Sequence, residues 1–128
     1  MSRVLLVEDE TVIAMGLVLS LEAAGFDVRA VPNGRQALGT LDEGFVPDVI
    51  ITDCMMPMMD GPTLTEIIRQ RREFDSVPIL MYSAVPQERL PAHAKYDAYM
   101  QKPIVDERLV EVLRKLLDGR QPPPLAAP

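Results

Sequence analysis

The sequence has little cysteine, no surplus of basic charge and no long hydrophobic run, and each shortage excludes a class of protein. Its one cysteine, Cys54, has no disulfide partner within the chain and favours a reducing compartment, so we expect a cytoplasmic protein. Nineteen acidic residues against 13 basic ones give a net charge of −6, which argues against direct binding to nucleic acid. The longest nearly apolar stretch, residues 12–19, is far too short to span a membrane, and residues 1–3 lead into no signal-peptide pattern.

Short apolar segments alternate with helical patterns along the chain. Strands are predicted at residues 3–7, 27–31, 49–52, 78–82 and 98–101. Helices are predicted at residues 10–24, 35–41, 63–74 and 106–117. Asn33 and Asp106 are the expected N-terminal caps of the second and the last helix. Because the strands are apolar throughout, both faces of the sheet should be covered, which predicts an α/β fold with a doubly wound, five-stranded parallel sheet.

The chain divides into one domain and a tail. Residues 1–119 suffice for a single domain with its own hydrophobic core. Residues 120–128 are rich in proline and are predicted to be disordered or extended. No DNA-binding or catalytic output domain follows, so we expect either a stand-alone domain that acts through protein contacts or a piece of a longer protein.

Polar residues capable of chemistry stand at four of the five strand ends, where open parallel sheets bind their ligands. The carboxylates Glu8, Asp9 and Asp53 follow the first and third strands, Ser83 follows the fourth and Lys102 the fifth. Grouped carboxylates repel one another unless a cation joins them, and an oxygen-only set favours Mg²⁺ or Mn²⁺ over zinc or copper. A metal-bound carboxylate beside a lysine is also what phosphoryl transfer requires.

These residues resemble the receiver domains of response regulators in two-component signalling, over about residues 3–118. The motifs that carry the resemblance are Val7-Glu8-Asp9-Glu10, Asp53 with Met56-Pro57 and Met59-Asp60-Gly61, Ser83-Ala84, and Lys102-Pro103. The resemblance implies the flavodoxin-like strand order 2-1-3-4-5. It also implies a phospho-accepting module of a two-component system or phosphorelay, which changes its protein contacts when phosphorylated and is not a turnover enzyme.

The resemblance assigns a role to each residue of the candidate site. Asp53 would accept the phosphoryl group from a phosphohistidine of a sensor histidine kinase or histidine phosphotransfer protein. Asp9 and Asp53 would bind Mg²⁺ (or Mn²⁺) directly, together with the backbone carbonyl of Met55, while Glu8 would act through water. Lys102 would pair with Asp53 before the reaction and with a phosphoryl oxygen after it, aimed inward by a cis peptide bond before Pro103.

Two further residues would couple phosphorylation to a conformational switch. Ser83 would move to hydrogen-bond the phosphoryl group. Tyr99 stands where the family often has an aromatic ring that turns inward at the same time, although it is equally well an ordinary strand aromatic.

Three departures from the family pattern carry information. Ser83 and Lys102 are only 19 residues apart and Pro91 lies between them, so the fourth helix should be short or irregular. Met55 and Val85, two residues beyond Asp53 and Ser83, are apolar and would not orient an attacking water, which predicts slow self-dephosphorylation. The helix at residues 10–24 is apolar almost all round, which we attribute to contact with the kinase, the alternative being extra burial against the last helix.

Other function classes fit the residues less well. A receiver-like module that is never phosphorylated would usually lack an acid, the acceptor or the lysine. An aspartyl-phosphate hydrolase would have a second aspartate at position 55, where methionine stands. A flavin-binding module would have a hydroxyl-rich loop in place of Glu8 and Asp9. Cys54, the neighbouring methionines and the lone His93 supply too few thiolates and imidazoles for a soft-metal site.

Overall fold

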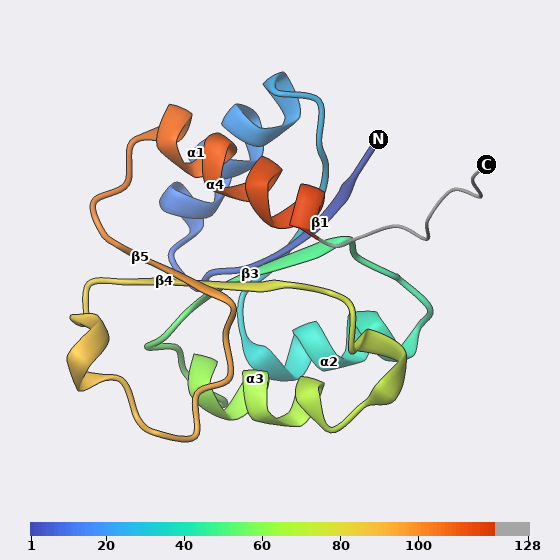
Figure 1. Cartoon of the computed structure of the whole chain (residues 1–128), viewed down its shortest axis with the longest axis vertical. Helices are drawn as coiled ribbons and strands as arrows, with labels where there is room; N and C mark the ends of the chain where they lie inside the picture. Colours follow the sequence, from blue (N-terminus) through green and yellow to red (C-terminus); the bar gives the residue numbers. More distant parts are fainter. Residues whose placement is uncertain (120–128) are drawn as a thin grey trace.

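The computed structural model describes residues 1–119, which form a parallel sheet with helices on both faces (Figure 1). The strands are β1 (Arg3–Val7), β2 (Asp27–Val31), β3 (Val49–Asp53), β4 (Ile79–Ser83) and β5 (Ala98–Gln101). The α-helices are α1 (Thr11–Ala23), α2 (Gly34–Asp42), α3 (Gly61–Arg69) and α4 (Asp106–Gly119). Two single-turn 3₁₀ helices are η1 (Arg72–Phe74) and η2 (Gln87–Arg89). The tail predicted for residues 120–128 lies outside the described residues.

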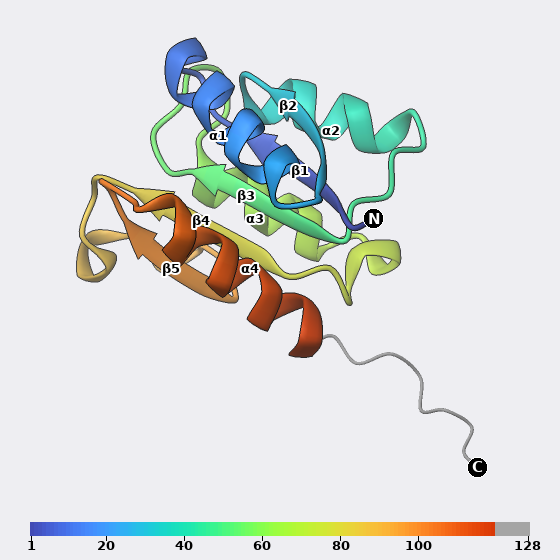
Figure 2. The same ribbon diagram turned by 90° about the horizontal axis from the view of Figure 1, so that it is seen from above.

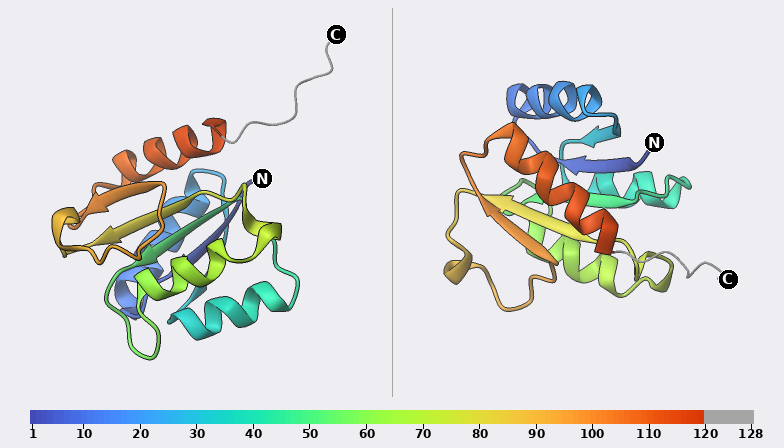
Figure 3. Two further views of the ribbon diagram at one scale, coloured as in Figure 1. Left: turned by 60° about the horizontal axis from the view of Figure 1, so that its bottom comes forward. Right: turned by 45° about the horizontal axis from the view of Figure 1, so that its top comes forward.

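The five strands follow the order β2-β1-β3-β4-β5, and every neighbouring pair is parallel. This confirms the predicted doubly wound sheet and its flavodoxin-like order. Helices α1 and α4 cover one face, and α2 and α3 cover the other (Figure 2). Because the strands are parallel, their carboxyl ends gather at one edge of the sheet (Figure 3).

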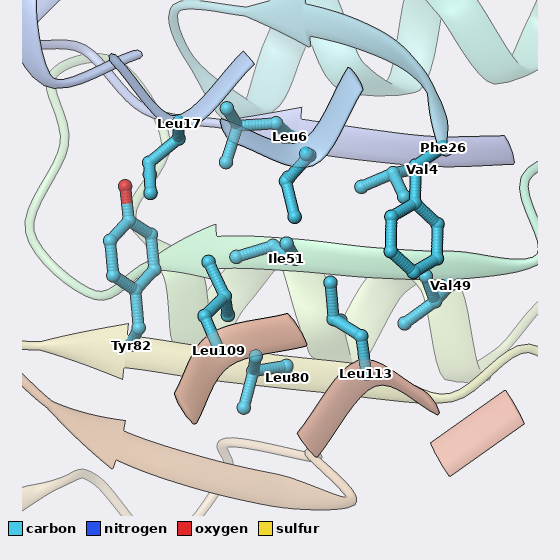
Figure 4. Close-up of a cluster of buried hydrophobic side chains, with 11 residues drawn as sticks. Val4, Leu6, Leu17, Phe26, Val49, Ile51, Leu80, Tyr82, Leu109 and Leu113 are labelled. Atoms are coloured by element: carbon cyan, nitrogen blue, oxygen red, sulfur yellow. The ribbon is translucent and has the colours of Figure 1, made fainter. Parts of the chain in front are cut away.

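Each face of the sheet has its own hydrophobic core, because successive side chains of a strand point to opposite faces. Leu6, Ile51 and Leu80 lie on the face covered by α1 and α4, with Leu109 of α4 (Figure 4). The intervening residues belong to the second core: Leu5, Ile50 and Ile79, with Leu64 and Ile68 of α3. The central strands β1, β3 and β4 are almost fully buried, as their uniformly apolar sequences predicted.

One predicted helix end and one predicted helix cap are wrong, and in both cases a side chain explains the difference. The third helix ends at Arg69 instead of continuing to residue 74, because the Arg69 guanidinium bonds the carbonyl oxygens of Phe74 (2.8 Å) and Val77 (2.5 Å) and stabilises a turn there. Asp106 is the first residue of α4 rather than its cap, and its carboxylate accepts a hydrogen bond from the Ser20 hydroxyl of α1 (2.6 Å). The predicted cap of α2 is confirmed, since the Asn33 side chain accepts from the Gln36 amide.

The connection between β4 and β5 contains η2 and no α-helix. This confirms the prediction of a short or irregular fourth helix. In the part of the chain that the structure describes, no helix has both the length and the apolar character needed to cross a membrane.

Candidate functional site

The candidate site lies at the carboxyl edge of the sheet, where β1, β3, β4 and β5 end. Glu8 directly follows β1, Asp53 ends β3, Ser83 ends β4 and Lys102 follows β5. The register pairs Asp53 with Tyr82 and the preceding Thr52 with Val7, so these strand ends are level with one another. Residues far apart in the sequence are therefore brought to one place by the sheet.

Three carboxylates form a cluster that could hold a metal ion. Glu8, Asp9 and Asp53 each offer one oxygen, and these oxygens lie within 4.8 Å of one another. Glu8 and Asp53 are buried, whereas Asp9 is exposed. A set made only of carboxylate oxygens and open on one side suits a hard divalent cation.

Lys102 forms ion pairs with both buried carboxylates of this cluster. Its ammonium nitrogen lies 3.0 Å from Asp53 Oδ2 and 3.1 Å from Glu8 Oε1. The ion pair expected with Asp53 is thus present, and the second one, with Glu8, was not predicted. The expected cis peptide bond joins Lys102 to Pro103.

Burial and hydrogen bonding shift the pKa values of these groups in different directions. Burial raises the pKa of Asp53, and the nearby charge of Glu8 adds to this, while Lys102 opposes it. Burial also raises the pKa of Glu8, but hydrogen bonds from Tyr82, the Glu10 amide and Lys102 outweigh it, so the net pKa is lowered. Burial alone would lower the pKa of Lys102, but its bonds to the two carboxylates raise it above its usual value.

Tyr82 belongs to the site, although the sequence indicated only a strand residue. Its hydroxyl donates a hydrogen bond to Glu8 Oε1, and its ring centroid lies 4.7 Å from the Lys102 ammonium nitrogen. The whole residue is 2% exposed. A buried tyrosine needs a partner for its hydroxyl, so a polar aromatic at the end of an otherwise apolar strand was the available signal.

The two predicted switch residues both contact Val85. The Ser83 hydroxyl is buried and accepts from the Val85 amide at 3.0 Å. The Tyr99 hydroxyl donates to the Val85 carbonyl oxygen, and its ring is partly buried on β5. The side chain of Met55, two residues beyond Asp53, is exposed.

A tight backbone contact holds the loop after β3 against the site. The Gly61 amide donates to the Cys54 carbonyl oxygen at 2.8 Å, and the Asp60 side chain caps α3 by accepting from the Thr63 amide. A Cβ at Gly61 would lie 2.1 Å from the carbonyl oxygen of Asp53. Only glycine fits there, so the backbone geometry explains why glycine stands at position 61, independently of the family resemblance.

Comparison with known proteins identifies the family of this chain. A family model described as response regulator receiver domain matches residues 4–114. The chain belongs to this family. The receiver-domain assignment made from the four motifs is thereby confirmed, and the acidic cluster of Glu8, Asp9 and Asp53 fits the metal-binding phospho-acceptor site of such domains.

Relatives of this receiver domain occur in sensor kinases and in transcriptional regulators. It is 32% identical to sensor kinase CckA of Brucella abortus over 91% of this chain but spans only 13% of CckA. The receiver domain of a signal transduction histidine kinase from Syntrophus aciditrophicus has a TM-score of 0.88 and 27% identity, with 100% of this chain and 98% of that chain covered. The receiver domain of sensor histidine kinase PA1611 from Pseudomonas aeruginosa, whose active-site cleft coordinates a magnesium ion, has a TM-score of 0.83 and 29% identity, with coverages of 91% and 98%. Other relatives are transcriptional regulators, of which this receiver domain spans about half.

Helix α1 of this receiver domain exposes large apolar side chains. Val12 is 83%, Met15 60% and Leu19 68% exposed. The opposite side of the helix packs on the sheet and α4 through Leu17 and Leu21. Extra burial against α4 thus accounts for part of the apolar content of this helix, and an exposed apolar surface remains.

Proposed function

We propose that this receiver domain takes a phosphoryl group from a phosphohistidine onto the carboxylate of Asp53. The observation that supports the proposal most strongly is the position of Asp53, which lies in the acidic cluster and 3.0 Å from the Lys102 ammonium. An oxygen of Asp53 would form a bond to phosphorus while the phosphorus–nitrogen bond of the phosphohistidine breaks. The electron pair of that bond stays with the imidazole nitrogen, so no proton has to leave Asp53.

The residues present fit a magnesium site, and the magnesium in the PA1611 receiver domain supports the same choice here. Asp9 and Asp53 would hold the ion directly, with the backbone carbonyl of Met55, and Glu8 would act through water. When bound, the ion supplies positive charge for the phosphoryl oxygens. Mn²⁺ has the same preference for oxygen ligands and would substitute.

Lys102 would be the group that changes partner during the reaction. Before phosphorylation its charge is shared between Glu8 and Asp53. Once Asp53 carries the phosphoryl group, a phosphoryl oxygen becomes the stronger acceptor for the ammonium. The lysine therefore stabilises the charge that the reaction brings into the site.

Ser83 and Tyr99 would connect the phosphoryl group to a change in protein contacts. A Ser83 hydroxyl that turns to the phosphoryl group gives up its bond with the Val85 amide, which frees the loop after β4. Tyr99 is bonded to the carbonyl of the same residue, so it would have to follow. The new charge thus selects between two arrangements of one loop.

The phosphodonor would be a sensor histidine kinase or histidine phosphotransfer protein in the cytoplasm, and it would dock on α1. The exposed apolar residues Val12, Met15 and Leu19 support this surface. We expect Leu19→Glu to slow transfer from a phosphorylated histidine kinase but to leave labelling by acetyl phosphate unchanged. Equal loss with both donors would contradict a docking role.

The proposal is tested by intact mass after incubation with Mg²⁺ and acetyl phosphate. We expect a single phosphoryl adduct on the wild-type protein and none on Asp53→Asn. Asp118→Asn, which changes an exposed aspartate of α4 in the same way, is the matched control and should be labelled normally. An adduct that persists in Asp53→Asn, or its absence from the wild type, would overturn the proposal and favour a receiver-like binding module.

A further inference from the structure

We propose that Tyr82 is a positioning residue that holds the Glu8 carboxylate in place for metal binding. This inference rests on the proposed function, because it concerns the same metal site. Among the described hydrogen bonds, the Tyr82 hydroxyl bonds to Glu8 and to neither Asp9 nor Asp53. It acts through Glu8.

The hydroxyl is the only part of Tyr82 that the hydrophobic core does not require. The side chain lies among Leu17, Leu80 and Leu109, and its oxygen points to the edge of that cluster (Figure 4). A phenylalanine would fill the same space. The hydroxyl therefore adds one thing, a hydrogen bond to Glu8 Oε1.

Glu8 is held from three directions. Oε1 accepts from the Tyr82 hydroxyl and from the Lys102 ammonium, and Oε2 accepts from the Glu10 amide at 2.9 Å. The Glu8 side chain has no exposed surface. A carboxylate that already has three donors is fixed in orientation, which suits a group that orients a metal-bound water better than one that must turn to bind the ion itself.

Tyr82 also limits where Lys102 can lie. The ammonium lies over the tyrosine ring while it bridges Glu8 and Asp53. The ring therefore helps to fix the position of the lysine, and the hydroxyl helps to fix the position of the glutamate. Removing the hydroxyl would let Glu8 turn toward Lys102. The carboxylate would then be less well placed for the ion.

The test compares Mg²⁺ affinity by isothermal titration in wild type, Tyr82→Phe and the matched control Tyr96→Phe. Tyr96 is a tyrosine of the loop before β5, whose hydroxyl accepts only from Gln87 among the described hydrogen bonds. We expect the dissociation constant to rise about tenfold in Tyr82→Phe, the lower end of what loss of a group that orients a metal ligand causes. Tyr96→Phe should match the wild type.

Measuring the effect of Tyr82→Phe in a protein that also carries Glu8→Ala separates a positioning role of Tyr82 from a general structural role. Without the acceptor, Tyr82→Phe should cause no further loss of Mg²⁺ affinity. A tyrosine absorption difference on adding Mg²⁺, present in wild type and absent from Glu8→Ala, gives the same information even if Tyr82→Phe unfolds. Unchanged affinity in Tyr82→Phe, or an equal loss with and without Glu8, would overturn the inference alone. A wild type that binds no Mg²⁺ would instead overturn the proposed function.

Discussion

Replacing Lys102 by methionine would leave two buried carboxylates, Glu8 and Asp53, without the cation they share. Methionine has nearly the length of lysine and no charge, so the change removes the ion pairs and keeps most of the packing. Without the lysine the two carboxylates repel each other at the edge of the sheet. The metal-free protein should therefore be less stable, and an added divalent ion should restore much of the loss.

The size of the effect follows from the distances. At 3.0 and 3.1 Å the gross attraction of each pair is about 5 kcal/mol at an effective dielectric constant of about 20. Desolvation offsets most of this, and breaking a buried pair typically costs about 3–5 kcal/mol net. The Lys102 side chain is 19% exposed, so we expect the lower end, about 3 kcal/mol.

Bound Mg²⁺ supplies the missing positive charge, so its binding should be stronger when the lysine no longer competes. If Mg²⁺ restores about 2 kcal/mol, the dissociation constant of Lys102→Met falls about thirtyfold relative to wild type. Urea denaturation with and without saturating Mg²⁺ measures both quantities. Lys95→Met, at an exposed lysine of the loop before β5, is the matched control and should change little. An equal loss of stability with and without Mg²⁺ would show that the ion does not replace the charge of Lys102.

Three other measurements concern the titration of Lys102, the close backbone contact at Gly61 and the residue two positions beyond Asp53. Because the pKa of Lys102 is raised, the stability that its charge contributes is complete below its usual pKa of 10.5 and is lost as the pH rises through the higher folded-state pKa. A rise in pH above 10.5 should therefore lower the free energy of unfolding, measured by urea denaturation, more in wild type than in Lys102→Met. Gly61→Ala should cost about 3 kcal/mol in urea denaturation, because its Cβ would meet the Asp53 carbonyl oxygen at 2.1 Å, whereas Gly39→Ala in an open part of α2 should stabilise by about 0.5–1 kcal/mol. Met55→Asn should shorten the lifetime of the phosphorylated protein severalfold, followed by intact mass after removal of the donor. An unchanged lifetime would count against slow self-dephosphorylation.

The sequence was sufficient to predict which strand ends would meet. Short apolar runs separated by helices leave few parallel arrangements, and in all of them the carboxyl ends of the strands share an edge. Asp53 and Lys102 could therefore be expected at one place although 49 positions separate them.

The details that the sequence did not reveal depend on where individual side chains reach. Tyr82 looked like one more core residue, because nothing in a strand pattern shows that its hydroxyl extends past β3 to Glu8. The early end of α3 depends on Arg69 bonding two carbonyl groups several residues later. Such contacts follow from the assembled structure and have no local signature in the sequence.

We propose that Asp53, in the acidic cluster with Glu8 and Asp9, accepts the phosphoryl group with the help of a divalent ion. This proposal is tested most directly by treating the protein with Mg²⁺ and acetyl phosphate, reducing the acyl phosphate with borohydride and mapping the modified peptide. We expect reduction at Asp53 alone and none when EDTA replaces Mg²⁺. Modification at another carboxylate, or labelling of Asp53 that is unaffected by EDTA, would contradict it.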